Sequence, residues 1–318
     1  MSISSTSIVW VGFHEEGFLA LKYLLEKNYP VTAIFTLNEE ASGKRAAVRD
    51  FSKLAEKYKV RLVEVSHIND ESSVAELKEL SPNILFVIGW SQILSKDVLS
   101  IASDYTIGAH ASLLPKNRGS APINWSLING ELVTGNTLIE LSEEVDAGAV
   151  LSQRKFQITL YDSCHTLYQK VAVSNRDMIV DFLMKYHSSN VEKKEQKIAG
   201  LPVLPRRRPQ DGLINWQQSA KKIYDFIRAL TKPYPGAFSY LGGKKVYLWK
   251  ASYSESSHIN GLGRFSEFYY SFEPELCSVR VECMQGSILI HQIEVEGEGM
   301  YFGADLHDRL KGVLQFDE

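Results

Sequence analysis

Two side chains able to exchange protons, His110 and Asp146, lie 36 residues apart in the first half of the chain. His110 stands in the stretch TIGAHASLLPKNRG, and Asp146 stands in EEVDAGAV. A carboxylate on a neighbouring loop can orient an imidazole, raise its basicity and accept a proton through water. The same two residues could also be a strand-end histidine and a turn-forming aspartate, so the pair alone leaves both interpretations open.

The segment that follows His110 carries cations suited to an anionic ligand. Pro115 and Gly119 predict an irregular loop, with Lys116 and Arg118 inside it. Both cations suit phosphate or carboxylate groups. We therefore expect this loop to face a ligand.

The elements that must position these residues alternate between strand and helix patterns. The expected strands are residues 7–13, 31–36, 61–65, 83–89 and 105–110, and the expected helices are residues 17–26, 48–58 and 73–80. Such alternation predicts an α/β fold with a Rossmann-like, mostly parallel sheet, whose ligands bind beyond the carboxyl ends of the strands. No GxGxxG motif follows the first strand, so a dinucleotide cofactor is not indicated.

The pattern changes near residue 200. The stretch LPVLPRRRPQD, from Leu201, is rich in proline and arginine and predicts a domain boundary. Short strand patterns separated by glycines follow from residue 244, which is typical of a smaller β-rich, barrel or OB-like C-terminal domain. We therefore expect a catalytic domain over residues 1–205 and a β-rich domain over residues 206–318.

Composition narrows the class of protein. The chain has 318 residues, 44% of them hydrophobic, and a net charge of −3, which gives no broad attraction to nucleic acid or to an anionic membrane. Its three cysteines form neither a disulfide framework nor a CxxC zinc pair, so no metal is expected. The N-terminus lacks the basic start and long apolar run of a signal peptide, and no apolar stretch approaches 18 residues. These features predict a cytoplasmic protein that binds neither nucleic acid nor membrane.

The residues around His110 and Asp146 resemble the N10-formyltetrahydrofolate-dependent formyltransferase family, most closely its sugar N-formyltransferase branch. The resemblance rests on HASLLP from His110, on RG from Arg118, on AP from Ala121 and on DAG from Asp146. Further similar stretches are Gly130, Thr134-Gly135, Gln153, Arg206-Arg207, residues 214–216, residues 227–229 and residues 233–238. The resemblance covers most of the chain and is weakest at the C-terminal end.

The resemblance implies transfer of a formyl group from N10-formyltetrahydrofolate to an amine, through a tetrahedral intermediate and without a metal. His110 would assist the oxyanion and the proton transfers, and Asp146 would tune His110 and help to take the proton. The formyl donor would contact Trp90, Gln92 and Leu94, with the backbone of Gln92 and Leu94 pairing with the pterin. Val145 would line the opposite side, although Trp90 and Leu94 could equally be core residues.

The sequence departs from the family at Gly108. The family usually has Asn-x-His, and that asparagine donates a hydrogen bond to the formyl oxygen. Losing one such donor costs about 2.7–4 kcal/mol if nothing replaces it. Three alternatives follow: a working transferase that uses protonated His110 or water instead, a binding-only relative, or a glycine that makes room for a different substrate pose. We favour the first because His110 and Asp146 are both present.

The acceptor implied by the sugar branch is the primary amine of a UDP- or dTDP-linked amino deoxysugar. The alternatives are initiator methionyl-tRNA, against which the net charge argues mildly, and a carrier-bound aminoacyl group. The expected substrate contacts are Gly108, Ser112, Lys116, Arg118, Gly119 and Asn124. The family also favours a homodimer.

Overall fold

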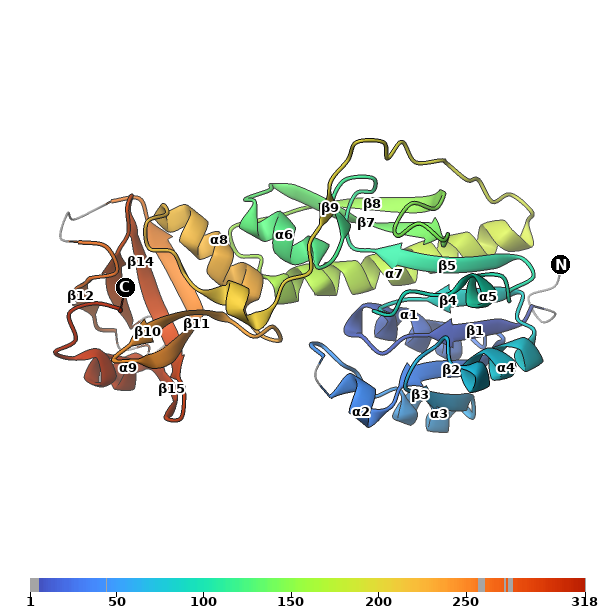
Figure 1. Ribbon diagram of the computed structural model, residues 1–318, viewed down its shortest axis with the longest axis horizontal. Coiled ribbons are helices and arrows are strands. Elements are labelled where there is room, and N and C mark those ends of the chain that lie inside the picture. The colour runs from blue at the N-terminus through green and yellow to red at the C-terminus, as the bar shows by residue number, and fades with distance from the viewer. Residues whose placement is uncertain (1–5, 44, 257–260, 272, 274–276, 318) are drawn as a thin grey trace. The chain divides into compact units, whose positions relative to one another are not determined.

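The computed structural model describes residues 6–43, 45–256, 261–271, 273 and 277–317, which form two compact units (Figure 1). The first unit comprises residues 1–122, 133–157 and 167–205. The second comprises residues 206–318 together with two short segments, residues 123–132 and 158–166. Two pieces of the first 205 residues therefore pack with the C-terminal unit. The predicted domain boundary at residue 205 stays a prediction.

The first unit is built on a mostly parallel sheet, as predicted. Its strands lie in the order β3-β2-β1-β4-β5-β7-β8, parallel from β3 to β5 and antiparallel at β7 and β8. The strands are β1 (Ile8–Val11), β2 (Val31–Leu37), β3 (Arg61–Val65), β4 (Ile84–Val87), β5 (Tyr105–His110), β7 (Val133–Glu140) and β8 (Val150–Gln157). The predicted strand over residues 105–110 is confirmed, and His110 is its last residue.

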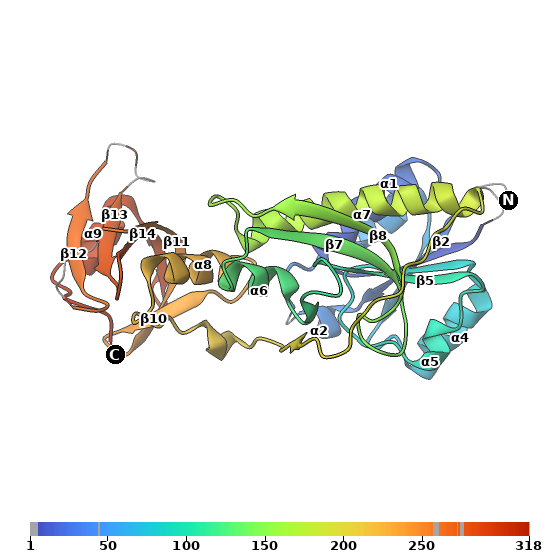
Figure 2. The same cartoon turned by 90° about the horizontal axis from the view of Figure 1, so that it is seen from above.

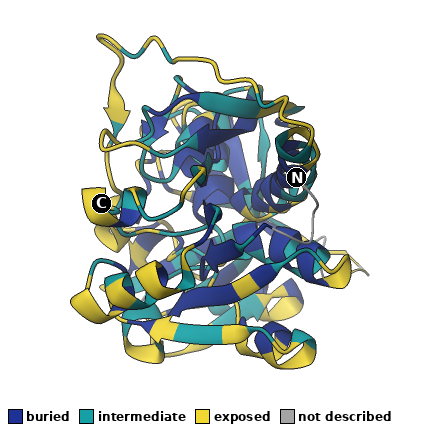
Figure 3. Ribbon diagram, turned by 90° about the vertical axis from the view of Figure 1, so that its right-hand side faces the viewer, coloured by how far each residue is buried: buried dark blue, intermediate teal, exposed yellow. Residues whose placement is uncertain are grey.

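Helices cover both faces of this sheet (Figure 2). One face packs against α1 (Glu15–Glu26), α3 (Ser52–Tyr58) and part of α7 (Cys164–His187), and the other lies against α4 (Glu71–Leu80) and α5 (Lys96–Leu99). The strands β1 and β4 are buried at every residue because both of their faces are covered. Figure 3 shows buried residues concentrated in the strands and exposed residues on the outer helices and loops.

The helices differ from the sequence prediction at their N-terminal ends and in number. The helix expected over residues 48–58 begins at Ser52, after Asp50 has bonded its side chain to the Ser52 N–H at 2.9 Å. The helix α7 was not predicted at all. Neither it nor any other helix that the structure describes has the length and apolar character needed to cross a membrane.

The second unit is β-rich, as predicted. Its antiparallel sheet has the order β10-β11-β14-β13-β12, and β15 pairs with β14. Its strands are β10 (Ala237–Leu241), β11 (Lys244–Ser254), β12 (Phe265–Tyr269), β13 (Ser278–Glu282), β14 (Ser287–Val295) and β15 (Gly299–Phe302), with helices α6 (Pro122–Ile128), α8 (Ala220–Leu230) and α9 (Gly303–Leu310). The C-terminal segment bridges both edges of the sheet, since Asp317 pairs with Tyr240 and Gln315 pairs with Arg264.

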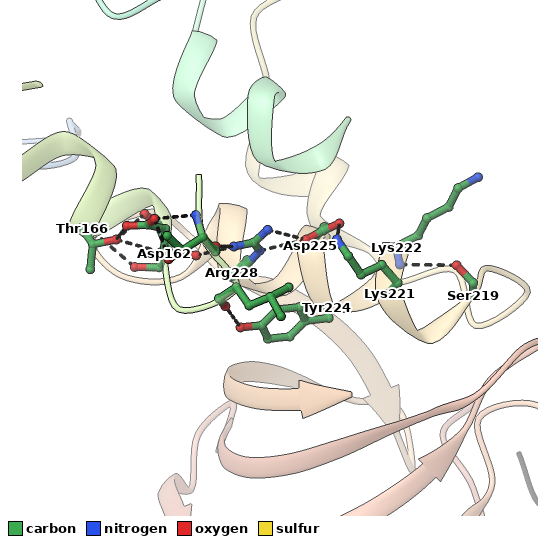
Figure 4. A network of polar contacts seen from close by, with 11 residues as sticks. Asp162, Thr166, Ser219, Lys221, Lys222, Tyr224, Asp225 and Arg228 are labelled. Atoms are coloured by element: carbon green, nitrogen blue, oxygen red, sulfur yellow. Dashed lines mark hydrogen bonds and ion pairs between the residues drawn. The ribbon is translucent and has the colours of Figure 1, made fainter. Parts of the chain in front are cut away.

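A buried ionic network ties α8 to the segment 158–166 within the second unit (Figure 4). Arg228 and Asp225 form an ion pair of 2.7 Å, and both side chains are almost fully buried. The Arg228 guanidinium also donates to the carbonyls of Thr159 at 2.6 Å and Asp162 at 2.7 Å. Lys221 reaches the other carboxylate oxygen of Asp225 at 2.6 Å from a partly exposed position. The guanidinium thus satisfies carbonyls that segment 158–166 would otherwise leave unpaired.

Removing one partner of this pair should destabilise the protein strongly. Asp225→Asn leaves the Arg228 charge buried without its partner, so we expect a loss of about 3–5 kcal/mol in unfolding free energy. Lys221→Gln, which removes the partly exposed cation, should cost less than about 1 kcal/mol. Chemical denaturation of both variants measures the difference, and equal losses would contradict the assignment.

Candidate active site

His110 ends β5 with its ring held between two acceptors. Its Nε2 lies 2.8 Å from the carbonyl oxygen of Asn117, and its Nδ1 lies 3.4 Å from Asp146 Oδ1. A carbonyl can only accept, so Nε2 must carry the proton and donate it to Asn117. In the neutral ring, Nδ1 is then left with a lone pair facing the carboxylate. Because it carries the lone pair, Nδ1 is the nitrogen that can take and return a proton. His110 as a whole is only 8% exposed.

A second contact fixes the orientation of the Asp146 carboxylate. Its Oδ2 accepts the backbone N–H of Gly119 at 2.9 Å, which leaves Oδ1 toward His110. The backbone of Asp146 has a φ of 55°, in the left-handed region that non-glycine residues rarely adopt. Two residues on, a side chain at Gly148 would place its Cβ 1.7 Å from the Glu140 carbonyl oxygen. The DAG turn therefore needs both its glycine and external support.

Gln196 supplies that support and was not identified from the sequence. Its side-chain amide donates to the carbonyls of Asp146 at 2.9 Å and Gly148 at 2.7 Å. The chain two residues before Gln196 is paired as well, because Lys194 exchanges both backbone hydrogen bonds with Val150. Gln196 is 50 residues from Asp146 in sequence, so no local spacing signals this contact.

The segment of residues 194–204, which we call the strap, continues to the loop after His110. Its strand β9 (Val203–Leu204) pairs in parallel with β6 (Arg118–Gly119). A Cβ on Gly119 would lie 2.5 Å from the Leu204 carbonyl oxygen, so this approach requires glycine. Residues 194–204 thereby hold the two loops that carry Gly119 and Asp146.

Polar side chains beneath the loop after His110 fix its path. Thr137, which pairs with His110 across β5 and β7, donates to the Ser112 carbonyl at 2.6 Å and accepts from the Leu114 N–H at 3.1 Å. Gln153 donates to Thr137 and to the Leu114 carbonyl, both at 2.9 Å. Ser112 closes the turn by donating to the Lys116 carbonyl at 2.7 Å. The predicted contact Ser112 therefore acts here as a loop brace.

Arg118 and Asn124, two further predicted substrate contacts, make protein contacts. Arg118 is buried and donates to Val145 O at 2.7 Å and to Glu144 Oε1 at 2.9 Å. These contacts join the loop that carries Asp146 to the loop after His110, which carries Arg118. Asn124 lies in the second unit and donates to the Ala229 carbonyl at 2.6 Å. Lys116 is exposed in the loop after His110. The substrate roles of all of these residues, and of Gly119, stay predictions.

Trp90, Gln92 and Leu94, which are predicted to contact the formyl donor, follow β4, and the fourth predicted contact, Val145, follows β7. Trp90 is half-buried with its ring 5.7 Å from that of Phe13, and its indole N–H is buried with no acceptor among the residues described. The Gln92 side chain is tied to the Ser66 carbonyl at 2.8 Å and to the Ile68 N–H at 2.9 Å, which leaves any ligand contact to its backbone. Leu94 packs in the apolar cluster on this face, and Val145 is 44% exposed.

Two domain families match this chain. Residues 20–183 match the formyl transferase family, and residues 207–309 match the formyl transferase C-terminal domain. The chain belongs to the formyl transferase family. The bifunctional polymyxin resistance protein ArnA of Wigglesworthia glossinidia brevipalpis is 34% identical over 251 residues. This match covers 79% of the chain but only 38% of ArnA, so the formyl transferase chain spans less than half of that relative.

Solved structures of low sequence identity share the fold. The N-formyltransferase from Helicobacter canadensis, in complex with folinic acid and dTDP-3-aminofucose, has a TM-score of 0.67 and 18% identity, over 92% of this chain and 99% of that one. HypX from Aquifex aeolicus, in complex with tetrahydrofolic acid, has a TM-score of 0.66 and 20% identity, over 97% of this chain and 48% of that one. No group of three or more His, Cys, Asp or Glu side chains placed to hold a metal occurs in the described part of this formyl transferase.

Gly108, where the family usually has asparagine, does not leave an open space. A Cβ built there would lie 2.6 Å from Leu141 Cδ2, because the leucine side chain covers the glycine. Leu141 also packs in the apolar cluster that contains Trp90 and Leu94. The room that the sequence suggested for water or substrate is therefore occupied by a flexible apolar side chain in this formyl transferase.

Gln196 should matter for turnover more than for binding. Gln196→Ala removes both hydrogen bonds to the DAG turn, and a misplacement of about 1 Å can cost about 10²-fold in rate. We expect kcat for formyl transfer to fall about 10–100-fold. Lys197→Ala, at the exposed neighbouring position, is the matched control. Equal kcat values for the two variants would contradict the support role.

Restoring the usual asparagine should require making space first. Gly108→Asn alone should transfer slowly, because its side chain must displace Leu141. Gly108→Asn combined with Leu141→Ala should be faster than either single variant if the amide then reaches the formyl oxygen, by up to about 10²–10³-fold. Steady-state rates of the four proteins decide this. A double variant no faster than Leu141→Ala would show that this position donates no such bond.

Proposed function

We propose that this protein transfers a formyl group from N10-formyltetrahydrofolate to the primary amine of a nucleotide-linked amino deoxysugar. The observation that carries the proposal is the His110 ring, held between the Asn117 carbonyl and Asp146. The family assignment supports formyl transfer, and the Helicobacter canadensis relative in complex with a dTDP-linked amino sugar supports this class of acceptor. Cytoplasmic location and a homodimer stay predictions.

The residues around His110 suit the proton transfers that acylation of an amine requires. As the amine attacks the formyl carbon, it must lose a proton, and the formyl oxygen becomes negative. His110 Nδ1, which faces Asp146, is the nitrogen that can take the proton of the amine, since Nε2 already carries a proton and donates it to Asn117. A proton on Nδ1 makes an imidazolium that can donate to the developing oxyanion, while Asp146 at 3.4 Å stabilises its positive charge. The proton then passes to the departing folate nitrogen.

The surface beside β4 suits the formyl donor. A pterin is flat and presents hydrogen-bond acceptors, and the buried indole N–H of Trp90 is a donor without an acceptor among the described residues. Ile93 and Val145 are 69% and 44% exposed, so they offer apolar surface nearby in the two loops that the resemblance assigns to the donor. These features support Trp90 and Val145 as contacts of the formyl donor.

A panel of acceptors tests the proposal directly. The protein is incubated with N10-formyltetrahydrofolate and UDP- or dTDP-linked amino sugars, initiator methionyl-tRNA, or a carrier-bound aminoacyl group, and the products are identified by mass spectrometry. We expect a formylated nucleotide sugar. His110→Asn should lower its formation about 10²–10⁴-fold. His165→Asn, at an exposed position of the second unit, should leave it unchanged.

Two results would contradict the proposal. Formylation of methionyl-tRNA or of the carrier group alone would replace the proposed acceptor. No product from any acceptor, with tetrahydrofolate binding retained, would identify a binding-only relative.

A further inference from the structure

Glu16 is a largely buried carboxylate that accepts no hydrogen bond from the residues that the structure describes. It lies in the first turn of α1, and its side chain is 16% exposed. Among the described residues nothing donates to its carboxylate, and the only basic group within 4.0 Å is the Nδ1 of His14. Buried charges in proteins are normally paired, because burial without a partner costs free energy. An unpaired carboxylate in this setting therefore indicates an external partner.

His14 cannot neutralise Glu16. Its Nδ1 accepts the backbone N–H of Glu16 at 3.3 Å, so this nitrogen carries a lone pair rather than a proton. Burial lowers the pKa of His14 to about 4, which keeps the ring neutral at physiological pH. The remaining proton is on Nε2, which therefore offers an N–H donor two residues before Glu16 in the chain. Tyr168 from α7 packs edge-on against the ring at 5.5 Å and holds its orientation.

The absence of a donor shows in the acidity of Glu16. Burial raises the pKa of this carboxyl to about 7, and no hydrogen bond offsets the effect. Strongly perturbed groups of this kind cluster at functional sites. A ligand that donates hydrogen bonds or carries positive charge would remove the cost of keeping the ionised form buried.

The His14 segment adjoins the loop predicted to bind the formyl donor. The ring of Phe13 lies 5.7 Å from that of Trp90, and the Phe13 N–H meets the Gly89 carbonyl at 3.4 Å. A Cβ on Gly89 would lie 2.8 Å from the His14 Cβ. Since β1, β4 and β5 are adjacent and parallel, Glu16 follows the same edge of the sheet at which His110 stands.

Glu16 and His110 approach this edge from opposite faces of the sheet. Helices α1 and α7 cover one face, whereas Gly108 and Leu141, next to His110, belong with Trp90 and Leu94 on the other. A formyl donor bound at the 89–94 loop therefore leaves the side of this sheet edge that α1 covers for a second ligand. A phosphate is unsuited to this side because Glu16 would repel it.

We propose that Glu16 and His14 form the subsite for the amino-sugar ring of the acceptor, an inference that rests on the proposed function. The Glu16 carboxylate accepts hydrogen bonds from the amine or a hydroxyl of the sugar. The His14 Nε2–H donates to a sugar oxygen. The nucleotide diphosphate lies outside this subsite.

Glu16→Gln, which keeps the shape and removes the charge, tests the subsite. The probes are a nucleotide amino sugar that the wild-type protein formylates, such as dTDP-3-aminofucose, and the matching bare nucleoside diphosphate. We expect Glu16→Gln to raise KM for the amino sugar at least 10-fold, with little change in the Kd of the bare nucleotide or in KM for the formyl donor. Glu15→Gln, the preceding carboxylate on the same helix turn, should behave as wild type. Glu16→Gln should melt no lower than the wild type, because it replaces an unpaired carboxylate.

The outcomes separate this inference from the proposed function. Normal wild-type turnover with an unchanged amino-sugar KM in Glu16→Gln overturns the subsite alone. An equal loss of affinity for the bare nucleotide, or a lower melting temperature, also overturns it by showing a nucleotide-binding or structural role. A wild-type protein that formylates no nucleotide amino sugar overturns both.

Discussion

The hydrogen bond from the Gly119 N–H to Asp146 Oδ2 is the contact on which the site depends. It joins the loop after β5 to the loop after β7 and turns the other carboxylate oxygen toward His110. Because Asp146 sits in left-handed backbone geometry, the carboxylate reaches this position only if both loops are held from outside. The strap from residue 194 to residue 204 and the buried Arg118 guanidinium provide that hold.

The sheet contributes the fixed half of the site. His110 is the last residue of a buried strand and pairs across the sheet with Thr137, whose hydroxyl bonds back to the loop that follows. Asn117, in that same loop, accepts the ring N–H. One loop thus determines both which nitrogen of His110 carries a proton and where Gly119 presents its N–H to Asp146.

Much of this arrangement could be predicted from the sequence. The strand 105–110, the parallel sheet and the β-rich C-terminal unit follow from apolar periodicity, which is a local signal. The contacts of Arg118, Gln196 and Leu141 could not be predicted, because each joins residues far apart in the chain. Arg118 is a cation of the kind that binds anionic ligands. Only the structure shows that it is buried and that its guanidinium already bonds to Glu144 in the loop that carries Asp146. Glu16 likewise has the sequence position of an ordinary first-turn acid, and only the structure shows that none of the described residues donates to its carboxylate.

The central claim, that the Asn117 carbonyl fixes the His110 ring so that Nδ1 handles the proton, can be measured by 15N NMR of histidine-labelled protein. At a pH high enough to make the ring neutral, the account predicts the tautomer with the proton on Nε2 and none on Nδ1. Comparison with His110→Asn assigns the signal. A neutral ring protonated on Nδ1, or an averaged mixture of the two tautomers, would contradict it.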